Sequence, residues 1–546
     1  MPGTWRGLDN QPAFSTSTMM LLTDGRVMVQ EEATNHWHAL TPDHTGSYVG
    51  GTWSRLADMS IWRRYYASGI LADGRVIVVG GEQSGGGGDT NRGEIYDPVT
   101  DSWTPIPPPP GWAMVGDAAS CILPDGRLMI GALTTPECTI YDPATDSWSA
   151  AASKAIRSNE ETWILLPDET IVTVQCFRPF RAEKYVISSN AWKPEGGPPV
   201  QLVDPVMAEI GPAMLMYDGR VIYFGAANVQ GRGKTAIYTP PTGVYGTGTW
   251  AAGPDIPTIG NQAIVSNDCP AALLPNGKVL FTAAPWVFNF WGSPVHFFEY
   301  DPATNLITRA PDPPNNGSVI YMSRLMLLPT GEVLCSPNAE VQCYVPDGAP
   351  REAWRPTISA VVADCDPRQP DHYLVHGTQL TGLSQANVYG DDCHPATNYP
   401  LVRLRSHATG DVRYCRTYDI SSMGVATGGT PQSFRFDAAG LPAGRYDLCV
   451  VANGISSHCV DFCPGLHRQC GCRDDRCDPC CRERCEPAGD PEVAKLRAEV
   501  RSLRAGIRRF SGQEQPDEER ALRREVHDPE ASPDDAGSTG DTGAPA

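Results

Sequence analysis

Residues 21–29 read LLTDGRVMV, which is an apolar run, a polar turn containing Asp-Gly, and a second apolar run. Glycine accepts the positive φ that a tight turn between antiparallel strands requires, so this phrase predicts a β-hairpin. The phrase returns along the chain as ILADGRVIVVGG from Ile70, ILPDGRLMI from Ile122, LLPDETIVTV from Leu165, LMYDGRVIYFG from Leu215, LLPNGKVLF from Leu273 and LLPTGEVLC from Leu327. The fourth repeat departs from the others because Asp168-Glu169 occupies its turn.

A second phrase, a tyrosine-containing strand followed by tryptophan, comes after several of these hairpins. Examples are EIYDPVTDSW from Glu94, TIYDPATDSW from Thr139 and the related FEYDPATNLI from Phe298. The repeat length of about fifty residues is typical of kelch units. A four-stranded unit cannot bury both faces alone, whereas seven units around an axis can, and the ring also protects the strand edges. We therefore expect an all-β fold with a seven-bladed kelch-type β-propeller over residues 1–355; an open sandwich array would not explain seven similar units.

Two features mark the ends of the expected propeller. GTWRGL from Gly3 echoes GTWSRL from Gly51, so the N-terminus is a candidate for the outer strand that closes the ring, although Trp354 competes for that role. From residue 356 to about Cys463 the DGR phrase stops while short strands continue, with LPAGRYDLCVVANG near the end. We expect an immunoglobulin-like β-sandwich over residues 356–463.

The cysteines leave their pairing open. Cys335 and Cys343 bracket a segment that reads as a hairpin, which brings a disulfide between them within reach. Residues 464–489 form a Cys-rich segment that is either a disulfide knot or a zinc-type site. Its candidate ligands are His467, Cys470, Cys472, Cys477, Cys480, Cys481 and Cys485.

Residues 490–510 carry the pattern of a helix, opened by Asp490-Pro491-Glu492. Its apolar residues recur at alternating steps of three and four between Val493 and Phe510. This pattern predicts either a short coiled coil, which would form a homodimer, or an amphipathic helix packed on its own domain. Residues 511–546 have the composition of a disordered acidic tail.

Charge and hydropathy exclude several kinds of partner. The formal net charge is −20 at pH 7, whereas nucleic-acid binding requires a basic face. No apolar run approaches the length of a membrane span. Residues 1–22 lack a basic n-region and a continuous apolar core, so we expect no signal peptide in the sequence. These observations do not identify a compartment.

The segment before each inner strand of a propeller lies at the mouth of the central channel, and here those segments are rich in polar residues. The residues eight positions before the turn Asp or its equivalent in each blade, with two neighbours included, are Thr16, Tyr65, Asp117, Glu160, Ile210 with Glu209, Asp268, and Met322 with Tyr321. Arg63, Arg64 and Arg324 are close in sequence. Polar groups that converge on a channel mouth indicate a binding site. The alternative is that they pair with one another or with the backbone.

The four carboxylates suggest three kinds of chemistry. Asp117, Glu160, Glu209 and Asp268 could bind a hard cation such as Ca²⁺, accept hydrogen bonds from sugar hydroxyls, or act as an acid–base pair in glycoside hydrolysis. Like charges at one mouth raise some of the carboxyl pKa values unless a cation or an arginine intervenes. The three arginines are the candidate partners.

Seven kelch blades followed by a sandwich resemble galactose oxidase and glyoxal oxidase, over about Gly3 to Cys463. The resemblance implies copper held by two tyrosines and two histidines, with one tyrosine cross-linked to cysteine beneath a tryptophan. It places Tyr65 at the radical tyrosine, Tyr321 at the axial tyrosine, and His394, or else the adjacent Cys393, at the sandwich-loop ligand. Met322 replaces the second histidine, Ser15 or Thr16 the cysteine, and Gln83 the tryptophan.

These replacements remove the thioether cross-link, the stacked indole and one imidazole, so we expect a degenerate copper site and no cofactor. We predict a binding or recognition scaffold for carbohydrate or protein, rather than a conventional oxidase. Its predicted binding residues are Arg63, Asp117, Glu160, Glu209, Asp268 and Arg324. The alternative is a divergent copper-radical oxidase of alcohols or aldehydes that uses Tyr65, Tyr321 and His394, with Met322 as a further metal ligand.

Overall fold

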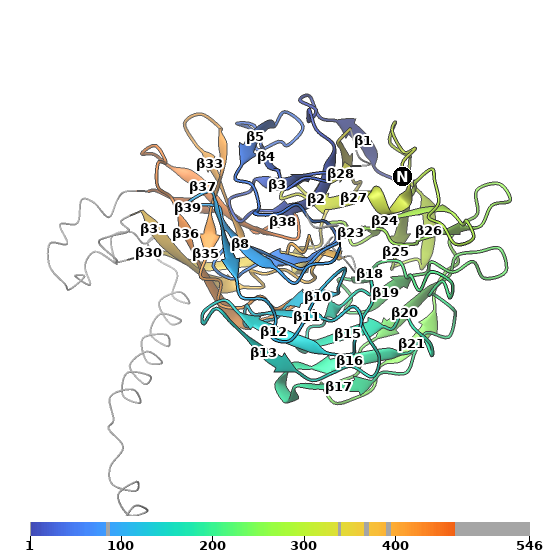
Figure 1. Ribbon diagram of the computed structural model, residues 1–546. Coiled ribbons are helices and arrows are strands. Elements are labelled where there is room, and N and C mark those ends of the chain that lie inside the picture. The colour runs from blue at the N-terminus through green and yellow to red at the C-terminus, as the bar shows by residue number, and fades with distance from the viewer. Residues whose placement is uncertain (1, 83–87, 337–339, 365–370, 389–394, 465–546) are drawn as a thin grey trace, which may run out of the picture. The chain divides into compact units, whose positions relative to one another are not determined.

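The structure is a computed structural model that describes residues 2–82, 88–336, 340–364, 371–388 and 395–464. Within these residues the chain forms a seven-bladed β-propeller followed by two further sheets (Figure 1). The predicted Cys-rich segment, the predicted helix at 490–510 and the acidic tail all lie outside the described residues, beyond residue 464. No helix in the described part is both long enough and apolar enough to cross a membrane.

Each blade is an antiparallel sheet whose strands follow chain order from the axis outward. Blade 1 contains β2 (Thr16–Leu21), β3 (Val27–Glu31), β4 (Trp37–Thr41) and β5 (Thr52–Leu56). Blade 2 contains β6 (Ala67–Ile70), β7 (Val76–Val79), β8 (Gly93–Asp97) and β9 (Ser102–Ile106). Blade 3 contains β10 (Ser120–Ile122), β11 (Leu128–Gly131), β12 (Cys138–Asp142) and β13 (Ser147–Ala151). Blade 4 contains β14 (Ile164–Leu165), β15 (Thr170–Val174), β16 (Ala182–Val186) and β17 (Ala191–Pro194). Blade 5 contains β18 (Ala213–Leu215), β19 (Val221–Phe224), β20 (Thr235–Thr239) and β21 (Thr249–Ala252). Blade 6 contains β23 (Ala271–Leu273), β24 (Val279–Pro285), β25 (His296–Asp301) and β26 (Leu306–Arg309), with the short β22 (Ile264–Val265) paired to β24.

Blade 7 is completed by the N-terminus. It contains β27 (Arg324–Leu327), β28 (Val333–Ser336) and β29 (Gln342–Val345), and β1 (Thr4–Gly7) pairs with β29 as its outer strand. Figure 1 shows β1 in the same region as β27 and β28, and β29 lies between β1 and β28 in the sheet. The indole of Trp5 lies 4.9 Å from the rings of both Phe297 and Tyr344, and its Nε1 donates to the Pro311 carbonyl. The first alternative for closing the ring is therefore confirmed, while Trp354 packs on Tyr217 instead.

The turns of the repeated phrase have the expected backbone. Gly25 and Gly74 have φ of +83° and +82°. In the divergent fourth repeat Glu169 takes the left-handed conformation, with φ of +60°. There Asp168 Oδ1 accepts hydrogen bonds from the backbone N–H and the hydroxyl of Thr170, which holds the turn without glycine.

Two sheets follow the propeller and face each other across a shared apolar core that includes Val375, Phe434, Leu404 and Leu448. One contains β30 (Thr357–Ala363), β31 (His372–Thr378), β36 (Pro431–Asp437) and β35 (Thr417–Tyr418). The other contains β34 (Val412–Cys415), β33 (Leu401–Ser406), β37 (Tyr446–Ala452), β38 (Ile455–Ser456) and β39 (Val460–Phe462). This arrangement is a two-layer sandwich; its immunoglobulin-like character stays a prediction.

The suggested disulfide between Cys335 and Cys343 is wrong, because both thiols are free. Cys335 is opposite Gln342 and Cys343 is opposite Leu334, so the two side chains point to opposite faces of the blade. A disulfide joins Cys449 to Cys459 in the sandwich instead.

The sandwich packs against the hairpin-turn end of the propeller, where two turn glycines permit close approach. A Cβ atom at Gly25 would lie 2.5 Å from Tyr414 Cγ, and one at Gly74 would lie 2.6 Å from the Thr417 carbonyl oxygen. These glycines therefore serve both the hairpin and the contact between the two parts.

A segment of the sandwich, residues 384–388, also runs inside the propeller. Its strand β32 (Asn387–Val388) pairs antiparallel with β23, the innermost strand of blade 6. Ser384 Oγ donates to the Leu215 carbonyl on blade 5, and Gln385 Oε1 accepts from the Leu165 N–H on blade 4. Contacts with the innermost strands of three blades place this segment on the axis. Because β32 is antiparallel to β23, it runs toward the end at which the inner strands begin.

We predict that Trp5→Ala lowers the free energy of unfolding by about 3 kcal/mol, because it empties the packing site that joins β1 to blades 6 and 7. Urea unfolding followed by tryptophan fluorescence and circular dichroism measures the loss. The control is Phe288→Ala, whose ring is 67% exposed, and which should change stability by less than about 0.5 kcal/mol. Equal stability of the two variants would contradict a role for Trp5 in ring closure.

Candidate functional site at the propeller axis

Three predicted site carboxylates meet where the inner strands of blades 4, 5 and 6 begin. Oxygen atoms of Glu160, Glu209 and Asp268 all lie within 4.8 Å of one another. We call these residues the carboxylate trio. Glu209 and Asp268 are buried, and Glu160 is half-buried. The trio could hold a cation or accept several hydrogen bonds from one polyhydroxylated ligand.

Backbone contacts between the blades hold the trio together. Glu209 ends a tight turn in which the Asp204 N–H donates to the Glu209 carbonyl at 2.8 Å. The Asp268 N–H donates to the Ile210 carbonyl at 3.2 Å, which couples blade 6 to blade 5. The Asn159 side-chain amide donates to the Ala208 carbonyl at 3.1 Å, which couples blade 4 to the same turn. The carboxylates thus sit on segments that are tied to one another.

Asp268 and Tyr65 share an unusual backbone conformation at equivalent positions of blades 6 and 2. Asp268 has φ of +48° and Tyr65 has φ of +53°, in the left-handed region that non-glycine residues seldom adopt. Such conformations cost energy and concentrate at functional sites. The guanidinium of Arg64 lies 4.9 Å from the Tyr65 ring centroid and pairs with Glu32 at 2.7 Å.

Adjacent glutamates of blade 4 have different environments. Glu161 is buried, pairs with Lys154 and accepts a hydrogen bond from Trp163 Nε1. Burial raises the pKa of Glu161 despite the opposing effect of Lys154. Glu160 instead joins the carboxylate trio. Sequence reasoning selected the glutamate that belongs to the trio, while its neighbour is part of the core.

A buried thiol lies near the same acidic groups. Burial raises the pKa of Cys176 well above its usual range, and the carboxylates of Glu161, Glu209 and Glu160 raise it further. Cys176 follows β15, the second strand of blade 4. Its thiol is therefore protonated at neutral pH and is not a nucleophile.

An exposed aromatic loop, residues 286–291 with the sequence WVFNFW, adjoins the segment that carries Glu209. It connects β24 to β25, and a bridge between Val287 and Phe290 forms its turn. Trp286 Nε1 donates to Asp204 Oδ2 at 3.3 Å. Phe288 and Phe290 are 67% and 58% exposed. Sequence reasoning missed this loop, although an aromatic run between the second and third strands of one blade interrupts the repeat and could have signalled it.

The aromatic loop also reaches the start of blade 7. The ring of Trp291 meets the ring of Tyr321 edge-on at 5.2 Å. Tyr321 and Met322 belong to the 3₁₀ turn η2 (Ile320–Met322), and the buried Arg324 donates to the carbonyls of Tyr321 and Ser323. The loop therefore links the segment next to the trio with the predicted blade 7 residues.

The remaining predicted residues belong to blades 1, 2 and 3. Asp117 is buried just before β10, and Thr16 Oγ1 contacts Ser336 Oγ between blades 1 and 7. Arg63 is fully buried, pairs with Glu94, and donates to the Arg92 carbonyl. We expected Arg63 to pair with the carboxylates at the channel mouth, but its guanidinium binds Glu94 and the Arg92 carbonyl within blade 2. Arg63 is therefore a structural residue of blade 2.

Copper does not fit the donors that the described residues offer here. In those residues, the segments before the inner strands contribute no imidazole, and the blade 7 position holds the thioether of Met322. Cu(II) in a tetragonal site prefers nitrogen and oxygen ligands, whereas a thioether is soft and favours Cu(I). His394 and Cys393 lie outside the described residues. The phenols of Tyr65 and Tyr321 together with a thioether do not make a standard copper-radical centre.

Several known proteins are similar to parts of this chain in sequence or structure. Residues 63–110 match the Kelch motif family. The chain is 41% identical to the galactose oxidase of Gibberella zeae over 56 residues, which span 10% of this chain and 8% of that enzyme. It is 29% identical to the Kelch-like protein terF of Aspergillus terreus over 123 residues, 22% of this chain and 26% of the relative. A copper-bound fungal alcohol oxidase of the AA5 family has a TM-score of 0.49 at 14% identity, covering 85% of this chain and 99% of that structure.

We predict that Cys176 resists alkylation in the folded protein at pH 8, because only the thiolate reacts and its pKa is raised. Iodoacetamide labelling of native protein, followed by peptide mass spectrometry, measures the modified fraction. The half-exposed Cys463 is the internal control and should react faster. Equal labelling rates at the two cysteines would place Cys176 outside the acidic core.

Proposed function

Because this chain carries a kelch motif and is similar to galactose oxidase over 56 residues, we propose that it recognises carbohydrate at the axial end of its propeller, without the copper-radical chemistry of galactose oxidase. The observation that carries this proposal is the carboxylate trio, with its oxygens within 4.8 Å of one another, next to the exposed aromatic loop. Both features belong to segments that converge at one end of the blades.

The carboxylate trio supplies the polar half of a carbohydrate site. Ionised carboxylates only accept hydrogen bonds, and sugar hydroxyls can donate them. Three acceptors from three blades would therefore fix the orientation of a ring, as a few convergent polar groups do in ligand sites generally.

The aromatic loop supplies the apolar half. A sugar ring has apolar C–H faces that can lie against an aromatic ring, while its hydroxyls reach polar groups at the edge. Phe288 and Phe290 are exposed, and the hydrogen bond from Trp286 to Asp204 fixes the loop beside the turn that carries Glu209. The acidic character of the site also disfavours nucleic acid, whose phosphates would be repelled.

A protein ligand is the other form of the same proposal. A protein partner would use the exposed aromatic side chains as anchors, and it would not need the trio to accept hydroxyl groups. Substitutions in the two features therefore separate the two forms of the proposal.

We predict that Glu209→Gln and Asp268→Asn each weaken glycan binding about tenfold to a hundredfold, because hydrogen bonds to charged groups contribute about 1.5–3 kcal/mol. Phe288→Ala should weaken it by a smaller factor, about fivefold. A glycan array identifies the ligand with wild-type protein, and isothermal titration measures each variant.

The controls are Asp461→Asn and Leu306→Ala, which change an exposed acid and an exposed apolar residue away from the site. Both should bind like the wild type. Absence of any glycan signal for the wild type contradicts the carbohydrate proposal. Loss of glycan binding in Phe288→Ala, with unchanged binding in Glu209→Gln and Asp268→Asn, would contradict the role of the carboxylate trio.

The copper-radical alternative is tested by metal analysis. We expect protein incubated with Cu(II) and then dialysed against a chelator to retain far less than one copper per chain and to show no radical absorption band, because a thioether replaces one imidazole. The variant Met322→His restores the missing ligand type and is the matched comparison. One tightly held copper in the wild type, with oxidation of an alcohol, would overturn the scaffold proposal.

A further inference from the structure

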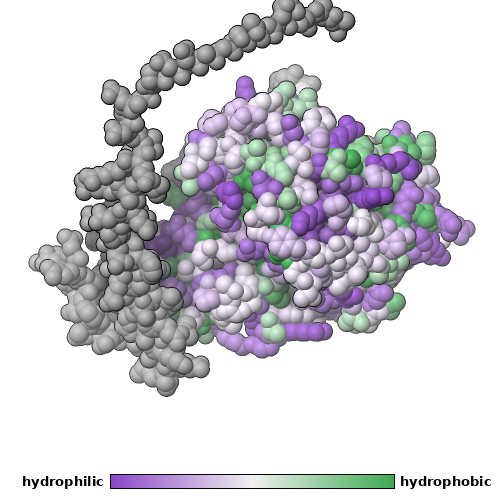
Figure 2. Space-filling model, turned by 90° about the horizontal axis from the view of Figure 1, so that it is seen from below, coloured by the Kyte–Doolittle hydropathy of each residue, from purple (hydrophilic) through white to green (hydrophobic). Residues whose placement is uncertain are grey.

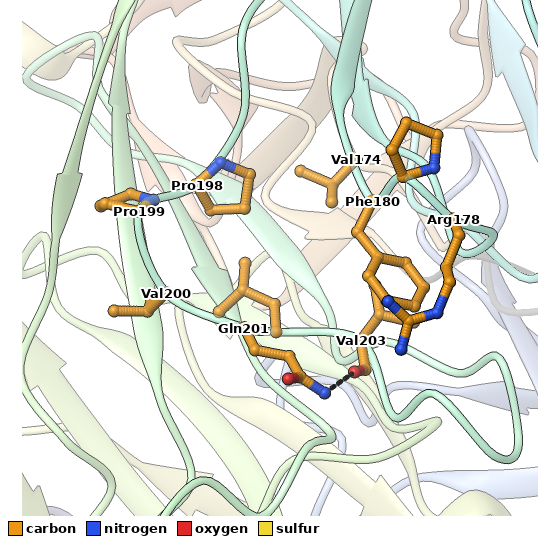
Figure 3. Close-up of a pocket in the computed structure, with 10 residues that line it drawn as sticks. Val174, Arg178, Phe180, Pro198, Pro199, Val200, Gln201 and Val203 are labelled. Atoms are coloured by element: carbon orange, nitrogen blue, oxygen red, sulfur yellow. Dashed lines mark hydrogen bonds between the residues drawn. The ribbon is translucent and has the colours of Figure 1, made fainter.

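A second candidate site lies on blade 4 and the chain that leaves it. A cavity of about 260 Å³ opens between the β15–β16 connection and residues 198–203, which lead toward blade 5. Its lining residues are Val174, Arg178, Pro179, Phe180, Pro198, Pro199, Val200, Gln201, Leu202 and Val203. Figure 3 shows Pro198, Pro199 and Val200 on one side of the cavity, with Phe180 and Arg178 on the other.

Most of the lining residues are apolar, although polar atoms contribute more of the exposed cavity surface than apolar atoms do. Val174, Leu202 and Val203 are buried, whereas Phe180 and Pro198 are half-buried and retain surface that a ligand could cover. The volume is below the roughly 300–1,000 Å³ of sites for drug-sized ligands, so the occupant is small. An apolar body of a few carbon atoms would fill this space and displace water from the proline and phenylalanine faces.

One cation faces this apolar lining. The Arg178 guanidinium lies 5.1 Å from the centroid of the Phe180 ring, and the two side chains lie together in Figure 3. Among the described residues, Arg178 forms no hydrogen bond and no ion pair. Gln201 Nε2 donates to the Val203 carbonyl at 3.2 Å, which fixes the amide at the same edge of the cavity.

Two further arginines strengthen the local positive charge. Arg157 lies 3.9 Å from the centroid of the Phe177 ring, and Arg181 is exposed beside Phe180 in sequence. Neither pairs with a carboxylate in the part of the chain that the structure describes. The chain has a formal net charge of −20, but these three arginines of blade 4 have no acidic partners among the described residues, and an anion would be attracted to them.

We propose that this cavity binds a small organic monocarboxylate, with its apolar body against Phe180 and the prolines and its carboxylate on Arg178. The planar guanidinium matches a carboxylate in a bidentate arrangement, and its cation–π contact with Phe180 favours this position before the ligand arrives. A cation of similar shape would be repelled, and a neutral molecule would lack the charge-assisted hydrogen bonds. This site is independent of the carboxylate trio and of carbohydrate binding.

The test uses the full chain and three probes of similar shape: benzoate, benzyl alcohol and benzylamine. Ligand-observed NMR and isothermal titration measure binding of each probe. We expect benzoate to bind at least about tenfold more tightly than benzyl alcohol, benzylamine not to bind, and added salt to weaken benzoate binding. Equal binding of benzoate and benzyl alcohol, or no benzoate binding, would overturn the proposal.

Substitutions at Arg178 test whether this residue binds the carboxylate of benzoate. Arg178→Gln should weaken benzoate binding about tenfold or more, and Arg178→Lys should restore part of it because the charge remains while the fork is lost. Arg181→Gln is the matched control, because Arg181 does not line the cavity. Arg178 is exposed, so the variants should fold, and circular dichroism checks this. Unchanged binding in Arg178→Gln would overturn the assignment.

Discussion

The fold depends on the pairing of β1 with β29. A ring of blades is stable only if its last sheet is completed, because an incomplete blade exposes a strand edge and one apolar face. Here the fourth strand of blade 7 comes from the N-terminus, and Trp5 packs between Phe297 and Tyr344 to hold it. β1 and β29 are more than three hundred residues apart in the sequence. Their pairing closes the ring, so the stability of each blade depends on the folding of the others.

Closure of the ring has a consequence for the axis. The innermost strands of seven blades surround a space that must be filled, and residues 384–388 of the sandwich enter it and pair with β23. Asn387 is wholly buried there, and its side-chain amide has no hydrogen-bond partner in the described residues. A buried amide in that state is commonly satisfied by an ordered water. Residues 384–388 thus fill the axis, and the buried amide of Asn387 keeps that segment partly polar.

The same end gathers the carboxylate trio, because the segments leading to the inner strands approach one another there. Those segments are not part of the sheets, so the repeat does not dictate their residues and they are free to carry function. The aromatic loop connects two strands, β24 and β25, and its residues are likewise not fixed by the repeat. Its exposed side chains are concentrated in one turn, whereas the face in Figure 2 has its hydrophobic surface broken into small patches among polar residues.

The repeated hairpin phrase determined the number of blades, since the Asp-Gly and Asn-Gly turns are local signals that mark each inner hairpin. The echo between residues 3–8 and 51–56 also indicated how the ring closes. The alternation of apolar and polar residues does not show how near the side chains of different blades lie to one another. The convergence of Glu160, Glu209 and Asp268 was therefore a hypothesis from sequence, and the tertiary structure shows it. The placement of Arg63 with Glu94 and the opposite orientations of Cys335 and Cys343 needed the sheet register. Local turn chemistry is encoded in adjacent residues, whereas charge partners and side-chain direction are set by contacts between distant ones, which only the tertiary structure decides.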